Sequence, residues 1–156
     1  MATAQNVAAY LLGVSQQHGD LLSNLKLQKF LYYAQAWHLA LNNRPLFDER
    51  IEAWVHGPAV PPIYGEFKKW AWMPIETQID LDRVELSEDE QAHLEEILDV
   101  YGGLSSYQLE KLTHSEDPWR NARGNIPPDE ASNAIISHDD MKNYYRSINA
   151  PPNQAS

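Results

Sequence analysis

The sequence predicts a mainly α-helical fold: a single compact domain of about six or seven helices, with room for one short strand pair. Apolar residues recur at spacings of three and four over most of the chain, which is the period of a helix with one buried face. Serine, threonine or aspartate precedes most of these stretches, at the position of an N-cap. The chain has 156 residues, of which 43% are hydrophobic, and this is enough for one domain with its own core.

The first two helices are predicted over residues 3–18 and 24–43. Thr3 is a suitable N-cap for the first helix, and Ser23 or Asn24 for the second. Lys26, Lys29 and Gln35 are predicted on or beside the polar side of the second helix. Its broad apolar face is predicted from Leu27, Phe30, Leu31, Ala34, Trp37, His38 and Leu41.

The next segment is rich in aromatic and β-branched residues and is broken by prolines. Residues 51–55 suit a short extended segment, and Gly57-Pro58 is typical of a turn. Pro61-Pro62 suits the first positions of a helix, which is predicted to run to about Trp70. Residues 71–86 are predicted to form a loop, with at most a little strand.

Four further helices are predicted in the second half of the chain. Two begin at capping boxes, in which a serine is followed three residues later by Glu or Gln. The third begins at Asp117-Pro118, with Asp117 as its cap, and Ser137 caps the last one. The folded domain is predicted over residues 3–148, followed by a disordered tail over 149–156. The two capping boxes are Ser87 with Glu90 and Ser105 with Gln108.

The charge is strongly negative and unevenly distributed. Twelve Lys and Arg stand against 22 Asp and Glu, for a net charge of −10. Residues 76–99 hold much of this excess, with Arg83 as their one base. Non-specific nucleic-acid binding needs many basic contacts to phosphate, so this composition argues against a nucleic-acid partner. The acidic segment is interpreted first as a solvated surface and second as a docking face for a basic partner, with Glu95 and Glu96 as contact candidates.

Several compartments and chemistries are excluded or disfavoured. There is no cysteine, so disulfides, thiolate nucleophiles and cysteine-based metal sites are excluded. No apolar run approaches the roughly 20 residues of a membrane span, and the N-terminus lacks the basic region of a secretion signal. A cytoplasmic protein without a membrane partner is the expectation.

No catalytic, metal or cofactor motif stands out. The six histidines include no H-x-x-x-H pair and no H-E-x-x-H, and there is no nucleophile elbow, Walker loop or G-x-G-x-x-G. We therefore predict no enzyme, no metal and no cofactor. A metal-dependent hydrolase that uses His56, His114 and Asp117 is the weaker alternative.

Five tryptophans are many for a core of this size. Trp37, Trp54 and Trp119 lie in apolar contexts and are predicted to be buried, with their indole N–H groups paired. Trp70 and Trp72 flank a predicted helix end. Burial is favoured for both, and exposure as anchors of a protein-binding patch is the alternative.

Three blocks of the sequence resemble the Panacea domain family, which includes SocA-like and GepA-like phage-associated proteins and PanA-type antitoxins. The blocks are LKLQKFLYYAQAWHLA (25–40), PLFDERIEAWVHGPAVPPIYGEF (45–67) and LTHSEDPWRNAR (112–123). The resemblance spans roughly residues 7–145. Phe30 stands where leucine is more usual and Ala59 where valine is, and both changes are mild.

The resemblance implies an all-α or nearly all-α antitoxin of a type II-like toxin–antitoxin pair. Such a protein neutralises a cognate protein toxin by direct binding, or, in one SocA-type member, delivers it to a Clp-type protease. The family carries no established catalytic residues, and the oligomeric state and the toxin are left open. Two interpretations of the block residues follow: a polar network that fixes the packing, which is favoured, or the lining of a toxin-contacting groove. The candidate partner-binding residues are Lys26, Lys29, His56, His114, Arg120, Trp70, Trp72, Glu95 and Glu96.

Overall fold

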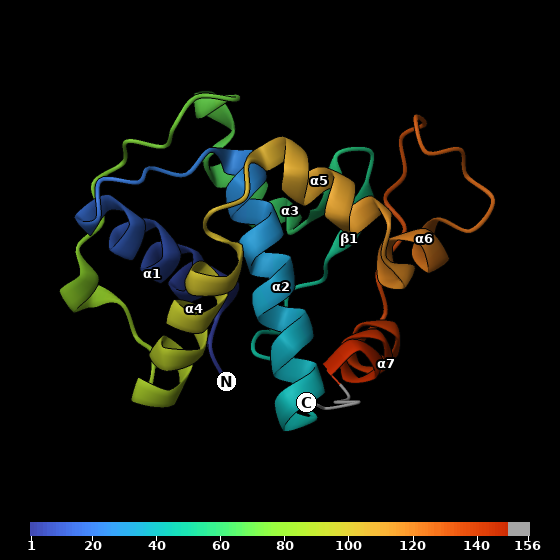
Figure 1. The fold of residues 1–156 in the computed structure, drawn as a ribbon. Coiled ribbons are helices and arrows are strands. Elements are labelled where there is room, and N and C mark those ends of the chain that lie inside the picture. Colours follow the sequence, from blue (N-terminus) through green and yellow to red (C-terminus); the bar gives the residue numbers. More distant parts are fainter. Residues whose placement is uncertain (150–156) are drawn as a thin grey trace.

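A computed structural model describes residues 1–149, in which one central helix is surrounded by the other elements (Figure 1). The prediction of a mainly α-helical domain is confirmed. The predicted tail lies outside the described residues, apart from its first residue, which ends the last helix. The elements are α1 (Ala4–Gln17), α2 (Asn24–Asn42), β1 (Glu52–Trp54), β2 (Gly57–Ala59), α3 (Pro61–Glu66), the 3-10 turns η1 (Lys68–Trp70) and η2 (Leu81–Arg83), α4 (Glu88–Tyr101), α5 (Ser106–His114), α6 (Asp117–Arg123) and α7 (His138–Asn149).

Helix α2 runs through the middle of the molecule and packs against α1, α4, α5, α7 and β2. The expected split into an apolar and a polar side is wrong for its middle, because these neighbours cover every side. Lys29 and Gln35 are both buried. The amide of Gln35 donates to the Phe47 carbonyl at 2.8 Å and holds the chain that follows the helix. Leu41, predicted on the apolar face, is 58% exposed, whereas Leu39 and Ala40 beside it are buried.

The predicted caps of the first two helices are confirmed. The hydroxyl of Thr3 accepts a hydrogen bond from the Asn6 N–H, and that of Ser23 accepts one from the Lys26 N–H. Asn43 ends α2 in the left-handed conformation, with φ of 58°.

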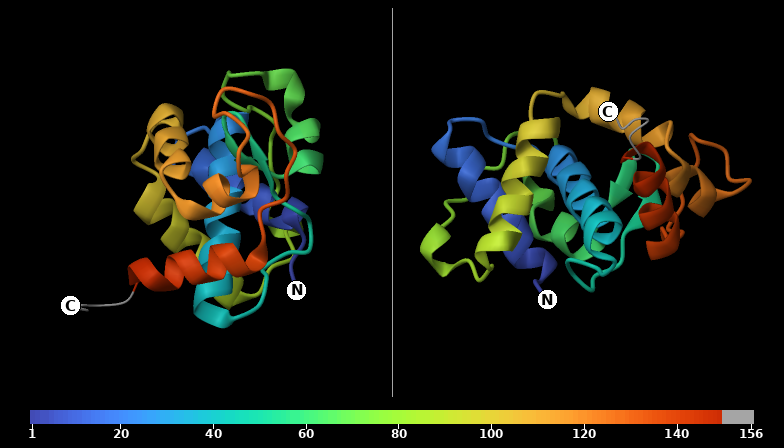
Figure 2. Two further views of the ribbon diagram at one scale, coloured as in Figure 1. Left: turned by 90° about the vertical axis from the view of Figure 1, so that its right-hand side faces the viewer. Right: turned by 60° about the horizontal axis from the view of Figure 1, so that its bottom comes forward.

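The short extended segment is confirmed as one strand of an antiparallel hairpin. Residue Glu52 pairs with Ala59, and Trp54 pairs with Gly57. The turn consists of Val55 and His56, so the prediction of a turn at Gly57-Pro58 is wrong. Two residues close the hairpin, and Gly57, with φ of 110°, is the first residue of the returning strand. The chain after α6 runs along the other side of β1 (Figure 2), where the Ala53 N–H donates to the Ala134 carbonyl at 2.8 Å.

The third helix ends earlier than predicted, at Glu66 instead of about Trp70. Phe67 turns inward and is 5% exposed, which breaks the helical run, and η1 follows. Residues 71–87 then pass over α1. A Cβ on Gly13 would lie 2.5 Å from Leu81, so this glycine lets the segment approach the helix closely.

Both capping boxes are confirmed at the starts of α4 and α5. The start of α6 is shifted by one residue from the prediction: Glu116 is the residue before the helix, and Asp117 is its first residue. Ser137 caps α7 through the Asp140 N–H, as predicted. No helix among the described residues is long and apolar enough to cross a membrane.

Candidate functional site

The three sequence blocks meet at the side chain of Lys29. This lysine comes from α2, Gly57 from β2 and Thr113 from α5. A Cβ on Gly57 would lie 2.5 Å from Lys29 Cε and 3.0 Å from Thr113 Oγ1. The positive φ of Gly57 and this close approach both require glycine here. The hairpin can therefore lie directly on the lysine side chain.

The Lys29 ammonium is buried and poorly satisfied. Lys29 is 2% exposed. The one hydrogen bond of its ammonium in the described structure is to the Leu25 carbonyl of its own helix, at 3.3 Å. An ammonium carries three donors, so two have no acceptor among the described residues. Burial lowers the pKa of Lys29 to about 8, and the nearby charge of Glu110 opposes this shift.

A cavity of about 540 Å³ opens beside Lys29. Its wall is mostly apolar and includes Leu25, Trp54 and Tyr64. The rings of Trp54 and Tyr64 pack edge to face, with their centroids 5.0 Å apart. The mouth lies between the hairpin turn and the chain that follows α6, at residues 131–133. The cavity therefore combines one buried cation with an apolar wall, which is the composition of many small-molecule sites.

His56 stands at the rim of this cavity and is mostly exposed. Its Nδ1 lies 3.2 Å from the Glu110 carboxylate, with Glu110 on α5. No ion pair joins Lys29 to Glu110 within the described part of the chain. No hydrogen bond or ion pair in the described structure joins the members of the predicted polar network to one another. These members are Lys29, His56, His114 and Arg120.

His114 lies behind the hairpin and stacks on Trp119, with ring centroids 4.0 Å apart. Burial lowers its pKa. Its Nε2 atom is buried and has no hydrogen-bond partner in the described structure. The pairing predicted for the indole N–H groups is confirmed: Trp119, for example, donates to the Trp54 carbonyl at 2.8 Å.

Arg120 does not join the block residues, and a different arginine takes the structural position. The side chain of Arg120 is exposed on α6 and makes no hydrogen bond or ion pair in the described residues. Three residues later, Arg123 is 3% exposed and donates to the carbonyls of Ala53, Pro127 and Glu130. Arg123, in the last turn of α6, reaches the carbonyls of β1 and of the loop after α6, whereas the side chain of Arg120 stays in solvent.

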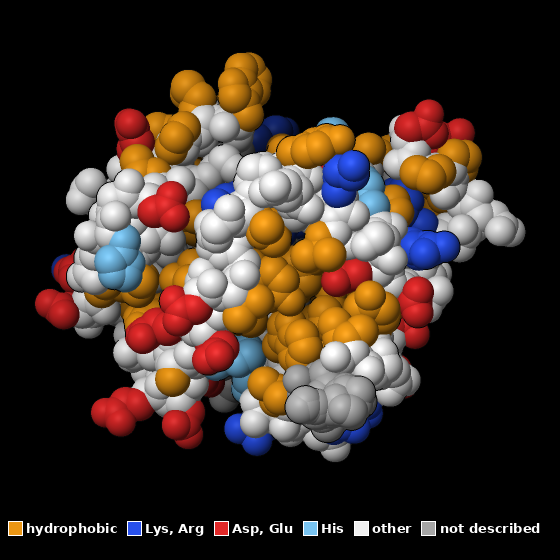
Figure 3. All heavy atoms as spheres, viewed as in Figure 1, with side chains coloured by type: hydrophobic (Ala, Val, Ile, Leu, Met, Phe, Trp, Pro, Cys, Tyr) orange, Lys and Arg blue, Asp and Glu red, His pale blue; other side chains and the backbone are white. Residues whose placement is uncertain are grey.

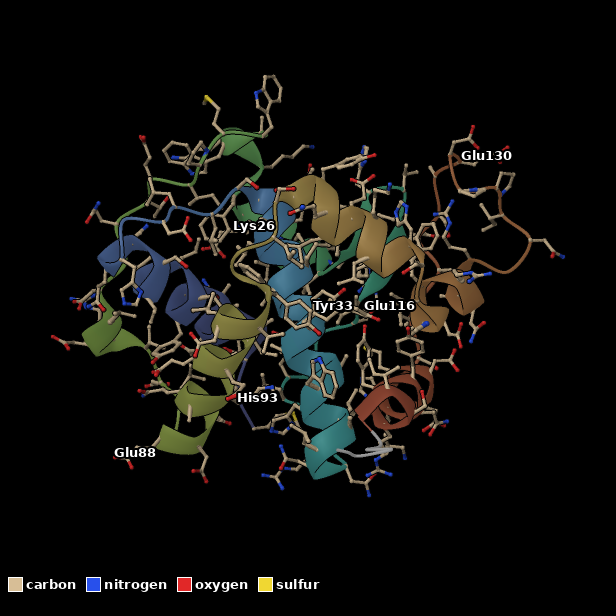
Figure 4. The ribbon with its side chains drawn as sticks, in the orientation of Figure 1. Lys26, Tyr33, Glu88, His93, Glu116 and Glu130 are labelled. Carbon is tan, nitrogen blue, oxygen red and sulfur yellow. The ribbon has the colours of Figure 1, made fainter. Side chains whose placement is uncertain are left out.

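A buried carboxylate and several tyrosines form a second polar cluster, which the sequence did not reveal. The Glu116 carboxylate accepts a hydrogen bond from the Tyr33 hydroxyl at 3.1 Å (Figure 4). The Tyr145 hydroxyl donates to the same oxygen at 2.6 Å and lies 3.1 Å from the Tyr32 hydroxyl. Burial raises the pKa of Glu116 to about 7, and the two tyrosine hydrogen bonds oppose the shift. The one sequence feature that could have indicated this cluster is the Tyr32-Tyr33 pair in the middle of α2, because two adjacent hydroxyls in a buried helix need hydrogen-bond partners.

Acidic side chains gather over α4 and the segment before it, at the left of Figure 3. Glu95 and Glu96 are both exposed, and Glu95 accepts a hydrogen bond from the Tyr10 hydroxyl of α1. Lys26 lies near the other end of α4, where its Nζ donates to the Gly102 carbonyl at 3.1 Å.

A groove of about 650 Å³ lies between α1, α4 and η2. Its walls combine apolar side chains with carboxylates. The apolar part includes Phe30, Leu81 and Leu98, and the acidic part Asp82 and Asp99. Nearly all acids of the segment 76–99 are exposed, as the interpretation as a solvated surface expects, and they border a groove whose walls mix apolar and acidic side chains.

Trp70 and Trp72 separate into two environments. Trp70 packs against the core, and its Nε1 atom is buried without a partner in the described structure. Trp72 is 82% exposed, so the favoured prediction of burial is wrong for it. Ala71, between them, has φ of 54° and ψ of −123°, a conformation rare outside glycine. The chain reverses at this alanine.

No group of three or more metal-ligating side chains is present among residues 1–149. His56 is paired with a carboxylate and His114 is packed on a tryptophan, so the described structure gives the predicted hydrolase residues no metal site. The arrangement around Lys29 offers a buried cation in a cavity, and the arrangement around α4 offers an exposed acidic surface.

Comparison with known proteins gives two matches. The family model for the antitoxin SocA-like Panacea domain matches residues 27–120. Antitoxin SocA from Caulobacter vibrioides (strain NA1000 / CB15N) is 33% identical over 127 residues, which cover 74% of this chain and 68% of that protein. No solved structure matches the chain. The range of the family model contains Lys29, Gly57, Thr113 and Glu116, and it leaves out α1 and α7.

Proposed function

The chain belongs to the SocA-like Panacea domain family, and from this membership we propose that it is an antitoxin that neutralises a cognate protein toxin by binding it directly. The observation that carries the proposal is the 33% identity to antitoxin SocA, which extends over most of both chains. The proposed action is stoichiometric binding, without turnover of a substrate.

The surface formed by α4 and the segment before it supports a protein partner with a basic face. Nine of the ten acids in residues 76–99 are exposed, with Glu90 half-buried. The groove beside them supplies apolar contact area through the half-buried Leu81 and Leu98. Protein interfaces combine an apolar centre with a polar rim in this way, and charge complementarity raises the rate of association.

The centre of the face shown in Figure 3 offers further apolar surface to a partner that binds on this side of the molecule. Apolar side chains gather there over α2, between α4, α5 and α7. Half-buried apolar residues of these helices include Trp37, Leu98, Leu112 and Tyr144. Trp72, exposed on the segment that leads toward α4, adds an aromatic anchor of the type that dominates interface energetics.

A growth assay tests the antitoxin role. The neighbouring gene is induced in a heterologous bacterium with and without this chain, in wild-type and Clp-deficient cells. Rescue in both strains is expected for direct binding. Rescue only in Clp-proficient cells would instead identify a proteolytic adaptor. If the neighbouring gene is toxic and this chain restores growth in neither strain, the chain is not its antitoxin.

Charge reversal tests the acidic surface. The double variant Glu96→Lys/Asp99→Lys should weaken binding of the toxin at least about tenfold and lower its association rate, because exposed charges of an interface act on encounter. The matched control is Asp129→Lys/Glu130→Lys, which makes the same charge change in the loop after α6. Glu88, at one end of α4, and Glu130 lie at opposite ends of the molecule in Figure 4. Equal loss of binding in both variants would argue against this surface.

A further inference from the structure

The cavity beside Lys29 is separate from the acidic surface. It is bounded by α2, the hairpin, α3 and residues 131–133, and it shares no lining residue with the groove between α1 and α4. Its volume of about 540 Å³ is far larger than the space of a single water and lies in the range of small-molecule sites. A role in binding the basic partner therefore does not explain it.

The buried lysine gives this cavity a defined polarity. Lys29 is 2% exposed, and its one acceptor is the carbonyl of Leu25. A buried cation without a counter-charge costs several kcal/mol, unless a partner or a shift to the neutral form offsets the cost. Even the neutral amine keeps two N–H donors, so deprotonation alone leaves hydrogen-bonding capacity unused.

The charged groups around Lys29 do not supply the missing partner. The charge of Glu110 acts on Lys29 from α5, but its carboxylate lies 3.2 Å from His56 Nδ1 and forms no ion pair with the lysine. His114, from the end of α5, is a base whose pKa is itself lowered, by burial and by the proximity of Lys29. Among residues 1–149, the surroundings of Lys29 thus offer no acceptor beyond the Leu25 carbonyl.

We propose that the cavity binds a small carboxylic acid with an apolar body, whose carboxylate pairs with Lys29 Nζ and whose body contacts Leu25, Trp54 and Tyr64. The carboxylate supplies the counter-charge that the fold omits. The edge-to-face pair of Trp54 and Tyr64 provides a flat wall suited to an aromatic ring or an alkyl chain. Gly57 holds the hairpin against the lysine stem and so fixes the position of the ammonium.

The probes are phenylacetate, hydrocinnamate and octanoate, each with its uncharged amide, added to the full chain. At about 10 mM, at least one carboxylate should raise the melting temperature by about 2 to 4 °C and shift the backbone amide signals of Gly57 and Asn133 saturably. The corresponding amide should bind at least about tenfold more weakly than the carboxylate, because it lacks the charge that pairs with Lys29.

Two variants decide whether the bound probe occupies this cavity. Lys29→Met removes the cation at similar volume and should weaken binding at least about tenfold, whereas Lys26→Met on the same helix should not. Ala131→Trp fills the exposed mouth, leaves the lysine in place and should also abolish binding. The proposal is overturned if no carboxylate binds, if the amides bind equally well, or if both cavity variants bind as the wild type does.

Discussion

Two buried ionisable groups, Glu116 and Lys29, show opposite ways of tolerating a charge in the interior. Glu116 is 4% exposed and receives two tyrosine hydroxyls that come from α2 and α7. Lys29 is 2% exposed, receives a single backbone carbonyl and faces a cavity. Burial shifts both pKa values toward the neutral form.

The difference lies in what the rest of the chain provides. Around Glu116, tyrosine side chains from two elements, α2 and α7, donate to one carboxylate, which makes the cluster part of the packing. Around Lys29, the fold brings three sequence blocks together and still leaves donors unused. A polar group completed from within is interpreted as structural, whereas one left incomplete beside a cavity is interpreted as a ligand site.

The largest expected effect is the loss of the Glu116 carboxylate. Glu116→Ala should lower the free energy of unfolding by about 3 to 4 kcal/mol at pH 6, because it leaves the hydroxyls of Tyr33 and Tyr145 without their acceptor and creates a cavity. Glu116→Gln keeps an acceptor oxygen and should cost no more than about 1 kcal/mol. Urea denaturation measures both values. Equal losses of unfolding free energy in the two variants would mean that the hydrogen bonds to Glu116 do not stabilise the fold beyond the packing of its side chain.

The pH dependence of stability should carry the signature of Glu116. Burial raises its pKa from 4.5 to about 7, so the folded state holds this proton more tightly than the unfolded state does. Its contribution is fully present below pH 4.5 and is lost as the pH rises to about 7, amounting to about 3 kcal/mol at most. Glu116→Gln should remove this slope in denaturation curves recorded across that range. An unchanged slope in the variant would assign it to other groups.

Arg123 extends the comparison to a third buried charge: its two terminal nitrogens donate to three backbone carbonyls, while its Nε has no partner in the described structure. Arg123→Met should lower the free energy of unfolding by about 2 kcal/mol, because three carbonyls lose their donor and the loop after α6 loses its anchor. Arg120→Met is the matched control and should change it by less than about 0.5 kcal/mol. Hydrogen exchange should also rise in residues 124–135 of the first variant only. A loop that stays protected would show that Arg123 does not hold it.

Local features of the fold could be predicted from the sequence, because each depends on a few neighbouring residues. The caps at Thr3 and Ser23 and the boxes at Ser87 and Ser105 involve partners three residues away. The extended segment of β1 was predicted for the same reason. The position of the turn was not, because Gly57-Pro58 suits a turn locally and its place in β2 depends on the approach of Lys29 and Thr113.

The candidate site depends on contacts between distant segments, so less of it could be predicted from the sequence. Lys29 could be singled out by its place in a sequence block, but its burial depends on β2 covering a side of α2 that looks polar. Glu116 looked like one of several polar residues at a helix start, and its tyrosine partners are 83 and 29 residues away. Arg120 and Arg123 are indistinguishable until the loop after α6 returns to β1.

Lys29 should affect stability with the opposite sign of pH dependence to Glu116. Burial lowers its pKa from 10.5 to about 8, so its contribution is fully present above pH 10.5 and is lost as the pH falls through about 8. The stability of the wild type relative to Lys29→Met should therefore rise by about 1 to 2 kcal/mol between pH 8 and about 9.5. This window avoids the buried tyrosines, whose raised pKa values weaken the fold above pH 10. A flat difference would mean that Lys29 is already neutralised by a partner in the protein.

The smallest expected effect on stability belongs to Trp72, which has no role in completing any buried group. Trp72→Ala should change the melting temperature by less than about 1 °C, because the side chain is 82% exposed. Trp70→Ala, two residues earlier, is the matched control and should lower it by several degrees, since that ring packs against the core. If Trp72 is an anchor for the toxin, the same variant should weaken the complex at least about tenfold. An unchanged affinity would remove Trp72 from the interface and leave the acidic groove as its centre. A large drop in the melting temperature would instead place Trp72 in the packing. Trp72 would then no longer be comparable to Lys29 as a group left free for an external partner.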